Sequence, residues 1–493
     1  MKRLYLLISI ICLTGSYCLA RQPDSVAFSV SKVLGDNMVV QRDKPFTVWG
    51  QAPTGHKIEV TVSWSRKSFA ATSNSQGVWE VKIPAASANT KAQIIVVKDI
   101  VNTAVIRLNN ILIGDVWICS GQSNMEMPID SISPFPGFPG VTDYKAEIAA
   151  ANYPALRLFK IPYGRSDAPE DNLKHNALWN KCTPDNAGKF SALAYFFARK
   201  VHIEINVPIG LVVSALGATS GEEWTARKVI DSDDALKSFY KHDKVSKLYN
   251  GMIYPLKKLA VKGFLWDQGE GNRNDPPGMY TRLNSAMIKD WRAIFNQGQL
   301  PFYFVQMTPY AAKFFFTNPW GDDPKASDYA RFREDQMLVR THTPNTGMAV
   351  NMDIDEIVHI HWQNKKPTGE RLALLALNQT YGHKNIQAVG PQYAGHKVNG
   401  DKVIIEYVAG TSNGLNAGGK PLAQHFYVAG ADSVFRQAAA TIRDNIVELA
   451  IPEGTPMPVL AVRYAFTNFP VTNLQNSAGL PAEPFRTDKW ISN

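Results

Sequence analysis

One stretch of the sequence places a hydroxyl and an amide directly after an apolar run. Residues 117–128 read WICSGQSNMEMP, so the run ends at Gly121 and is followed closely by Ser123 and Asn124. A serine hydroxyl attacks a carbonyl when a base takes its proton and when N–H donors stabilise the resulting oxyanion. Gly121 permits a tight turn and Asn124 carries amide donors, although Met125 stands where the G-x-S-x-G elbow has its second glycine. The stretch therefore predicts either a structural turn or a serine nucleophile.

Two later apolar runs end on residues that could assist such a serine. The run 207–217 ends at Gly217, whose main-chain N–H could bind an oxyanion. The run 261–269 leads into a Gly-rich turn that carries the amide of Gln268 and the carboxylate of Glu270. Each feature alone is also compatible with an ordinary loop, and only their combination points to acyl transfer.

Two histidines follow a further apolar run. His359 and His361 come after the run 346–354 and, being two residues apart, share one face of an extended segment. A neutral imidazole is the usual base for a serine nucleophile. A metal site of both histidines and Asp355 is the alternative, although its set of ligands would be incomplete. Serine, N–H donors and histidine together predict an acyl-transfer site.

A parallel sheet would bring these groups together. Helical stretches separate the apolar runs, and one of them, residues 279–295, has apolar residues three and four apart on one face. Another helix is expected from Pro367 to Gly382, with proline at its start and glycine just past its end. Continuous apolar strands joined by helices indicate an α/β sheet covered on both faces. Ligands bind at the carboxyl ends of the strands in such a sheet. The predicted strands are 111–120, 207–217, 261–269, 300–309 and 346–354.

The chain is long enough for more than one domain. Its 493 residues exceed the roughly 250 to 300 at which a single core stops growing. Residues 21–108 alternate short β-rich runs with turn signals, which predicts an N-terminal β-sandwich. Residues 109–384 form the predicted α/β domain, and residues 385–493 return to short strands as a C-terminal β-rich region.

Residues 1–20 have the features of a secretory signal. Lys2 and Arg3 precede the apolar run 4–13, and a small-residue cleavage site ends at Ala20. The run is much shorter than the about 20 residues of a membrane-spanning helix. We expect an exported protein without a membrane span, located in a periplasm or outside the cell.

Cys119 and Cys182 are the cysteines that such a mature chain would keep. An exported compartment would allow them to form a disulfide, and two separate buried thiols are the equal alternative.

The net charge of +9 comes from 52 Lys and Arg against 43 Asp and Glu residues. The basic residues are scattered and form no block of five or six, so we expect no nucleic-acid partner. The sequence specifies no oligomeric state.

Several motifs resemble the sialate O-acetylesterases of the SGNH hydrolase superfamily. They are GDVWICSGQSNMEMP, LGATSGEEWT, VKGFLWDQGEGN and IHWQNKKPTGERLA, with DNMVVQRDKPFTVWG near the start and NLQNSAGLPAEPFRTDKW at the end. The resemblance covers essentially the whole mature chain. It implies a three-layer SGNH-like α/β esterase domain with β-rich appendages, acting without metal or cofactor on an acetylated sugar.

The resemblance also implies roles for individual residues. Ser123 matches the nucleophile and His361 the catalytic histidine of the family. Gly217 matches the glycine of the second motif, and Gln268 matches an oxyanion donor. The expected activity is a serine esterase that removes acetyl groups from sialic acid. The alternatives are an esterase for acetylated xylan and a catalytically silent carbohydrate-binding protein.

This sequence departs from the family pattern around the catalytic histidine. Trp362 replaces the usual proline, Asp267 stands where an aromatic is common, and Gly271 replaces a small hydroxyl residue. Superfamily members often carry an aspartate three residues before the histidine, and that position is Val358 here. The acid that orients His361 is therefore open.

We expect Glu270 to be that acid, with Asp353, Asp355 or a main-chain carbonyl as alternatives. A competing base is His359, which has Glu356 three residues before it.

Substrate contacts are predicted from side-chain type. Asn124, Trp224 and Trp266 are expected to bind the sugar, the tryptophans by stacking on its ring. Lys365 or Arg273 could pair with the carboxylate of a sialic acid.

Overall fold

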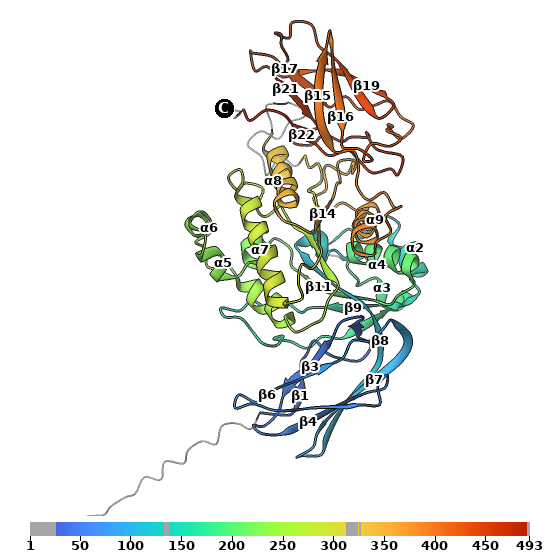
Figure 1. Cartoon of the computed structure of the whole chain (residues 1–493), viewed down its shortest axis with the longest axis vertical. Coiled ribbons are helices and arrows are strands. Elements are labelled where there is room, and N and C mark those ends of the chain that lie inside the picture. The colour runs from blue at the N-terminus through green and yellow to red at the C-terminus, as the bar shows by residue number, and fades with distance from the viewer. Residues whose placement is uncertain (1–25, 133–137, 312–323, 325–326, 491–493) are drawn as a thin grey trace, which may run out of the picture.

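The computed structural model describes residues 26–132, 138–311, 324 and 327–490. The predicted signal at residues 1–20 lies outside the described residues. Figure 1 shows two β-rich regions at opposite ends of the molecule, with a mixed α/β region between them. The expected fold class, a central parallel α/β sheet with β-rich regions at both termini, is confirmed.

The central sheet is parallel except at one edge. Its strand order is β10-β9-β11-β8-β12-β13-β14, and only β10 runs antiparallel to its neighbour β9. The bounds are β8 (Ala104–Gly121), β9 (Tyr153–Lys160), β10 (Trp179–Cys182), β11 (Ile209–Ala215), β12 (Gly263–Asp267), β13 (Phe302–Val305) and β14 (Thr346–Ala349). The five apolar runs thus form neighbouring strands, so their carboxyl ends meet at one edge.

Both faces of this sheet are buried, which explains why its strands are apolar throughout. In β8, Val116 and Ile118 join one hydrophobic core, whereas Trp117 and Cys119 join the other. Helices α4 (Ala192–Ile205) and α9 (Lys365–Leu375) pack against the second core, and α7 (Met279–Phe295) packs against the first. Helix α8 (Asp328–His342) lies beside α7 (Figure 1).

Both predicted helices are present. Helix α7 has the predicted bounds, and α9 begins at Lys365, two residues before Pro367. The carboxylate of Glu356 accepts the main-chain N–H groups of Gln363 at 2.7 Å and Asn364 at 2.8 Å, and so stabilises this earlier start. A π-helical turn, η5 (Ala376–Thr380), continues α9 towards Gly382, whose φ is +79°.

Short helices occupy the connections. They are α1 (Ser123–Glu126), α2 (Tyr144–Ala150), α3 (Pro184–Ala187), η1 (Gly221–Trp224), α5 (Arg227–Asp231), α6 (Asp234–Phe239), η2 (Tyr249–Ile253) and η3 (Tyr254–Leu256).

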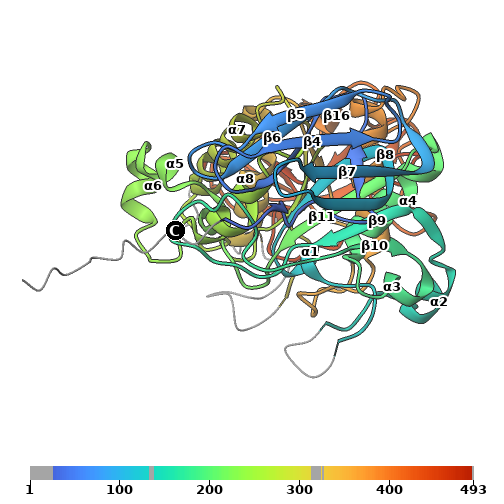
Figure 2. The same ribbon diagram turned by 90° about the horizontal axis from the view of Figure 1, so that it is seen from below.

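The N-terminal region consists of two packed sheets. One sheet has the order β1-β3-β6, and the other pairs β5 with β4, β4 with β7 and β7 with the first part of β8. Figure 2 looks onto these strands from below. The bounds are β1 (Ser29–Val30), β2 (Val39–Gln41), β3 (Phe46–Gln51), β4 (Lys57–Val62), β5 (Ser68–Thr72), β6 (Val78–Ile83) and β7 (Asn89–Asp99). Since β8 is one continuous strand, it belongs both to this region and to the central sheet.

The C-terminal region has two four-stranded antiparallel sheets, ordered β15-β16-β20-β19 and β18-β17-β21-β22. Their bounds are β15 (Tyr393–Asn399), β16 (Lys402–Tyr407), β17 (Phe426–Ala429), β18 (Arg436–Gln437), β19 (Ala439–Arg443), β20 (Ile446–Ala450), β21 (Ala461–Tyr464) and β22 (Phe485–Arg486).

Cys119 and Cys182 are both buried and both free thiols, so the alternative of a disulfide is wrong. In the described part of the chain, every helix is too short or too polar to cross a lipid bilayer.

Candidate active site

Ser123 lies at the carboxyl end of β8, where β11 and β12 also end. Strand pairing sets Gly121 opposite Ala215 on one side and Asp267 on the other. The φ of Gly121 is +137°, and a Cβ there would lie 2.0 Å from the carbonyl oxygen of Asp267, so the turn requires glycine. Ser123 follows as the first residue of α1, buried but for 7 % of its surface. The turn therefore presents the serine at the edge where ligands bind.

Gly217 reaches Ser123, but its N–H group is already engaged. A Cβ on Gly217 would lie 3.4 Å from the Cβ of Ser123, so the two predicted residues are neighbours. The main-chain N–H of Gly217 donates to Oε2 of Glu126 at 2.8 Å, and Oε1 of Glu126 lies 3.6 Å from the Nζ of Lys160. In this arrangement Gly217 does not offer its N–H to an oxyanion, which corrects the predicted role.

Gln268 holds the site together from within. Its side chain is 2 % exposed, and its amide group donates to Oδ1 of Asn272 at 2.8 Å and to Oε1 of Gln122 at 3.2 Å. A third acceptor, the main-chain oxygen of Thr219, lies 3.3 Å away. Its donor groups thus bind Gln122 in the turn that carries Ser123 and acceptors in two other loops, so the prediction of Gln268 as an oxyanion donor is wrong.

Two main-chain N–H groups remain for an oxyanion. Among the described residues, the N–H groups of Ser123 and Asn124 meet no hydrogen-bond acceptor, because they open the first turn of α1. Both belong to the turn that carries the hydroxyl, so they lie beside the position where the oxyanion forms.

His361 is half-buried on the segment before α9. Its ring meets that of Phe138 edge-on, with 5.1 Å between the ring centroids. Burial, and secondly the positive charge of Lys365, lower the pKa of His361 to about 4. The imidazole is therefore neutral at physiological pH, the form that can accept a proton.

The link between His361 and Ser123 is a hydrogen bond between their chain neighbours. The Nδ2 of Asn124 donates to the carbonyl oxygen of Ile360 at 3.2 Å, which joins the residue after the serine to the residue before the histidine. In the described part of the chain, neither the hydroxyl of Ser123 nor the imidazole of His361 makes a side-chain hydrogen bond. Such bonds often close only when substrate is bound.

The predicted acid does not contact the histidine. Glu270 is buried and uses Oε1 to accept from Asn124 Nδ2 at 2.8 Å, and so it does not orient His361 as we expected. Asp353 forms an ion pair with Arg371 at 2.5 Å, and Asp355 is exposed. Within the described residues, the histidine therefore has no carboxylate partner.

The structure forms neither the alternative pair of His359 and Glu356 nor the alternative metal site. Glu356 binds the main chain ahead of α9 and not the side chain of His359, which is exposed. Among the described residues, a metal site would need at least three His, Cys, Asp or Glu side chains close together, and no such group is present. Asp355, His359 and His361 therefore do not form one.

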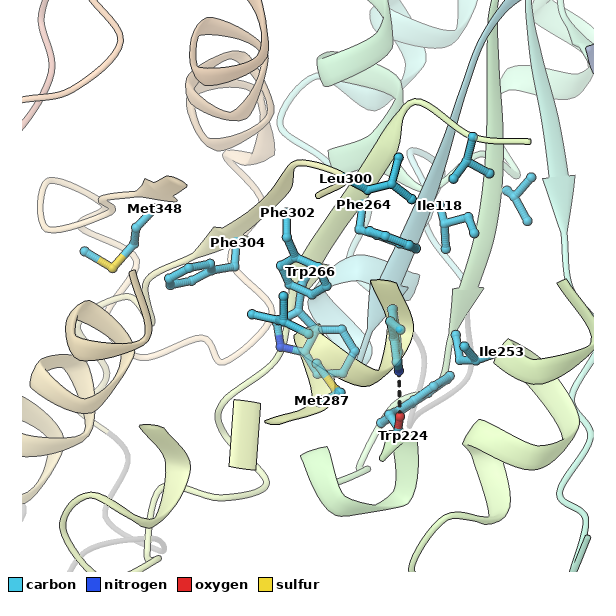
Figure 3. Close-up of a cluster of buried hydrophobic side chains, with 14 of the residues drawn as sticks. Ile118, Trp224, Ile253, Phe264, Trp266, Met287, Leu300, Phe302, Phe304 and Met348 are labelled. Carbon is cyan, nitrogen blue, oxygen red and sulfur yellow. Dashed lines mark hydrogen bonds between the residues drawn. The ribbon is translucent and has the colours of Figure 1, made fainter. Parts of the chain in front are cut away.

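Asn124 and the two tryptophans are not free to bind a sugar. Asn124 and Trp224 have no exposed surface, and Trp266 is 2 % exposed. Figure 3 shows both tryptophans among apolar side chains from the strands and from α7, and their rings meet edge-on with centroids 6.3 Å apart. They belong to the hydrophobic core, so the prediction of substrate contacts is wrong for all three residues.

The two cationic residues predicted to bind the carboxylate of a sialic acid also have partners within the protein. Lys365 is completely buried, and its Nζ lies 2.6 Å from Oδ1 of Asn124. Arg273 donates to the main-chain oxygen of Glu270. Lys160, which the sequence did not suggest, keeps 47 % of its side chain exposed on the side of the site where Gly217 and Glu126 lie.

Comparison with known proteins agrees with this geometry. The family model of carbohydrate esterases described as sialic acid-specific acetylesterase matches residues 113–378. The sialate O-acetylesterases of Pongo abelii and Homo sapiens are each 27 % identical over 508 residues, which cover 93 % of this chain and 92 % of each relative. The crystal structure of a carbohydrate acetylesterase from Xanthomonas citri is 33 % identical, covers 94 % of this chain and 100 % of its own, and has a TM-score of 0.82. The chain therefore belongs to the sialic acid-specific acetylesterase family of carbohydrate esterases.

Proposed function

We propose that this protein is a serine esterase that removes O-acetyl groups from sialic acid, with Ser123 as nucleophile and His361 as base. The observation that supports it most is the hydrogen bond from Asn124 to Ile360, which brings Ser123 and His361 to the same edge of the sheet. The neutral state of His361 fits the role of a base.

The reaction would proceed in two acyl transfers. The hydroxyl of Ser123 attacks the acetyl carbonyl while His361 takes its proton, and the N–H groups of Ser123 and Asn124 bind the oxyanion. His361 then gives the proton to the departing sugar oxygen, which leaves an acetyl group on Ser123. Water, deprotonated by His361, then attacks this ester, and His361 returns the proton to the oxygen of Ser123 as the bond to the acetyl group breaks and acetate leaves.

Two observations favour sialic acid as the sugar. The curated relatives from Pongo abelii and Homo sapiens are named sialate O-acetylesterases. The half-exposed Lys160 provides a cation near Ser123 that could pair with the carboxylate of the substrate. The carbohydrate acetylesterase from Xanthomonas citri keeps a wider choice of sugar open, and acetylated xylan is the alternative substrate.

The test is acetate release measured side by side on 9-O-acetylated sialic acid and on acetylated xylan. We expect faster release from the sialic acid, and none from either substrate with Ser123→Ala. Faster release from xylan would overturn the choice of sugar, and equal release by Ser123→Ala would overturn the mechanism.

We also propose that the protein is exported and acts in a periplasm or outside the cell. The proposal rests on residues 1–20, with two basic residues before an apolar run that ends at Ala20. The mature protein would then begin at Arg21, which N-terminal sequencing of the protein from its host would show. A protein that retains Met1 would contradict it.

A further inference from the structure

Asn124 is the centre of a buried polar cluster beneath the candidate active site. Its Nδ2 donates to Oε1 of Glu270 at 2.8 Å and to the carbonyl of Ile360 at 3.2 Å, and its Oδ1 accepts from Nζ of Lys365 at 2.6 Å. Asn124 and Lys365 have no exposed surface, and Glu270 is 6 % exposed. Both amide protons of Asn124 are therefore used inside the protein, and its orientation is determined.

The cluster buries charge, which is costly unless the charges are paired. Glu270 is accompanied by Asp267, which is 4 % exposed, and both carboxylates act electrostatically on Lys365. The ammonium of Lys365 also lies 3.1 Å from the ring centroid of Trp362. Within the described residues, Asp267 Oδ2 and Glu270 Oε2 accept no hydrogen bond.

An arrangement of this kind adds little to stability, because well-packed apolar residues of similar volume often serve a core equally well. The cluster therefore calls for an explanation from function.

The hydrogen-bond partners of Asn124 suggest that function. Asn124 directly follows Ser123, Ile360 directly precedes His361, and one hydrogen bond joins them. No carboxylate in the described chain orients the imidazole. We propose that Asn124, held between Glu270 and Lys365, is the positioning residue that sets Ser123 and His361 relative to each other, in place of the acid of a serine triad. This inference rests on the proposed function of those two residues.

Lys365 has a second effect on the same site. The charged groups that face it are Asp267, Glu270 and Glu356, while His361 faces Lys365 as its nearest charge and Phe138 as its ring neighbour. A positive charge disfavours the protonated imidazole, whereas a triad acid would favour it. Burial is the main cause of the lowered pKa of His361, and Lys365 adds to it while its ammonium donates to Asn124.

A pair of variants at Glu270 distinguishes positioning from acid catalysis. Glu270→Gln keeps an oxygen that can accept from Asn124, whereas Glu270→Leu removes the acceptor. If Glu270 only holds Asn124, we expect Glu270→Gln to retain kcat within about fivefold and Glu270→Leu to lose about 100-fold, the effect of a misplacement of about 1 Å. If Glu270 were the triad acid, Glu270→Gln would lose about 10,000-fold.

The pH profile of kcat/KM tests Lys365. Lys365→Met removes the charge that faces His361, so we expect the acidic limb to move upward by about one pH unit. Lys366→Met, the same change at the exposed neighbouring position, should leave the limb in place. Should Lys365→Met fail to fold, the double variant Asp267→Asn/Lys365→Met, which removes two buried ionisable groups that face each other, takes its place.

The positioning inference is overturned if folded Glu270→Leu keeps wild-type kcat. The effect of Lys365 on the base is overturned if Lys365→Met and the double variant leave the acidic limb unmoved. These results are distinct from a failure of the proposed function, which would show as acetate release by Ser123→Ala.

Discussion

The side-chain amide of Asn124 donates to the main-chain carbonyl of Ile360 at 3.2 Å, which spans 236 residues of sequence. This bond connects the turn that presents Ser123 with the segment that carries His361. The geometry between the two reacting groups is therefore held by the side chain of Asn124 bound to a main-chain carbonyl, and not by a carboxylate bound to the imidazole.

The pH dependence of the wild-type enzyme follows from the environment of His361. Burial and Lys365 lower its pKa from 6.5 to about 4, and the neutral form, which is the base, exists above that value. We expect kcat/KM to hold steady down to about pH 5 and to fall about tenfold per unit below about pH 4. An acidic limb at the ordinary histidine value of about 6.5 would contradict this environment.

Lys160 should affect the choice of substrate. Because its half-exposed ammonium lies 3.6 Å from Glu126 beside the site, Lys160→Gln would weaken binding of an anionic sugar. We expect KM for 9-O-acetylated sialic acid to rise by about 3- to 10-fold, since a partly solvated charge pair contributes about 1 kcal/mol. The matched control is acetyl release from p-nitrophenyl acetate, which is uncharged and should be unaffected. An equal change for both esters would exclude recognition of charge.

Trp266 should matter for stability and not for sugar binding. It is 2 % exposed and packs against Trp224 and Trp291 in the core. We expect Trp266→Phe to lower the free energy of unfolding, and Trp266→Ala to lower it by about 3–5 kcal/mol. Denaturant unfolding measures the loss, and KM of the folded Trp266→Phe variant measures binding. A large rise in KM with unchanged stability would restore the stacking role.

Asp267 should make stability depend on pH. Burial, and secondly the nearby charge of Glu270, raise its pKa to about 8, whereas in the unfolded chain it ionises at about 3.9. Between these values the folded protein binds a proton that the unfolded chain lacks, so its stability falls as pH rises. Asp267→Asn removes this loss, and its unfolding temperature should exceed that of the wild type by more at pH 8 than at pH 5. A difference that is constant or that shrinks with pH would contradict the raised pKa.

The sequence allowed the frame of the site to be predicted. Gly121 ends an apolar strand, Ser123, Gly217 and His361 each follow one, and the carboxyl ends of neighbouring parallel strands meet at one edge. Spacing of three and four residues likewise predicted the helix Met279–Phe295. These features depend on local pattern, which a single sequence contains.

The hydrogen-bond partners of the polar side chains could not be predicted in the same way. Asn124 has the same amide whether it faces a ligand or Lys365, which lies 241 positions away. Gln268 is likewise engaged by Thr219, 49 positions away. Trp266 lies in a strand whose neighbours in the sheet cannot be read from the sequence alone, and an indole ring packs in a core as readily as it stacks on a sugar.

Glu126 was missed although it lies in the first motif. Only the turn of α1 brings its carboxylate to the N–H of Gly217, 91 positions along the chain. An acidic residue three positions after the serine was the available signal. Phe138, the ring neighbour of His361, follows a Pro- and Gly-rich stretch without periodicity and offered none.

The most direct test of the account is covalent trapping of the nucleophile. The wild type and Ser123→Ala are treated with a fluorophosphonate, digested and analysed by mass spectrometry, with acetate release measured on the same samples. We predict one modified peptide that carries the label on Ser123, loss of acetate release in step with labelling, and neither label nor activity in Ser123→Ala. Acetate release that persists in Ser123→Ala, or after complete labelling of Ser123, would contradict the account.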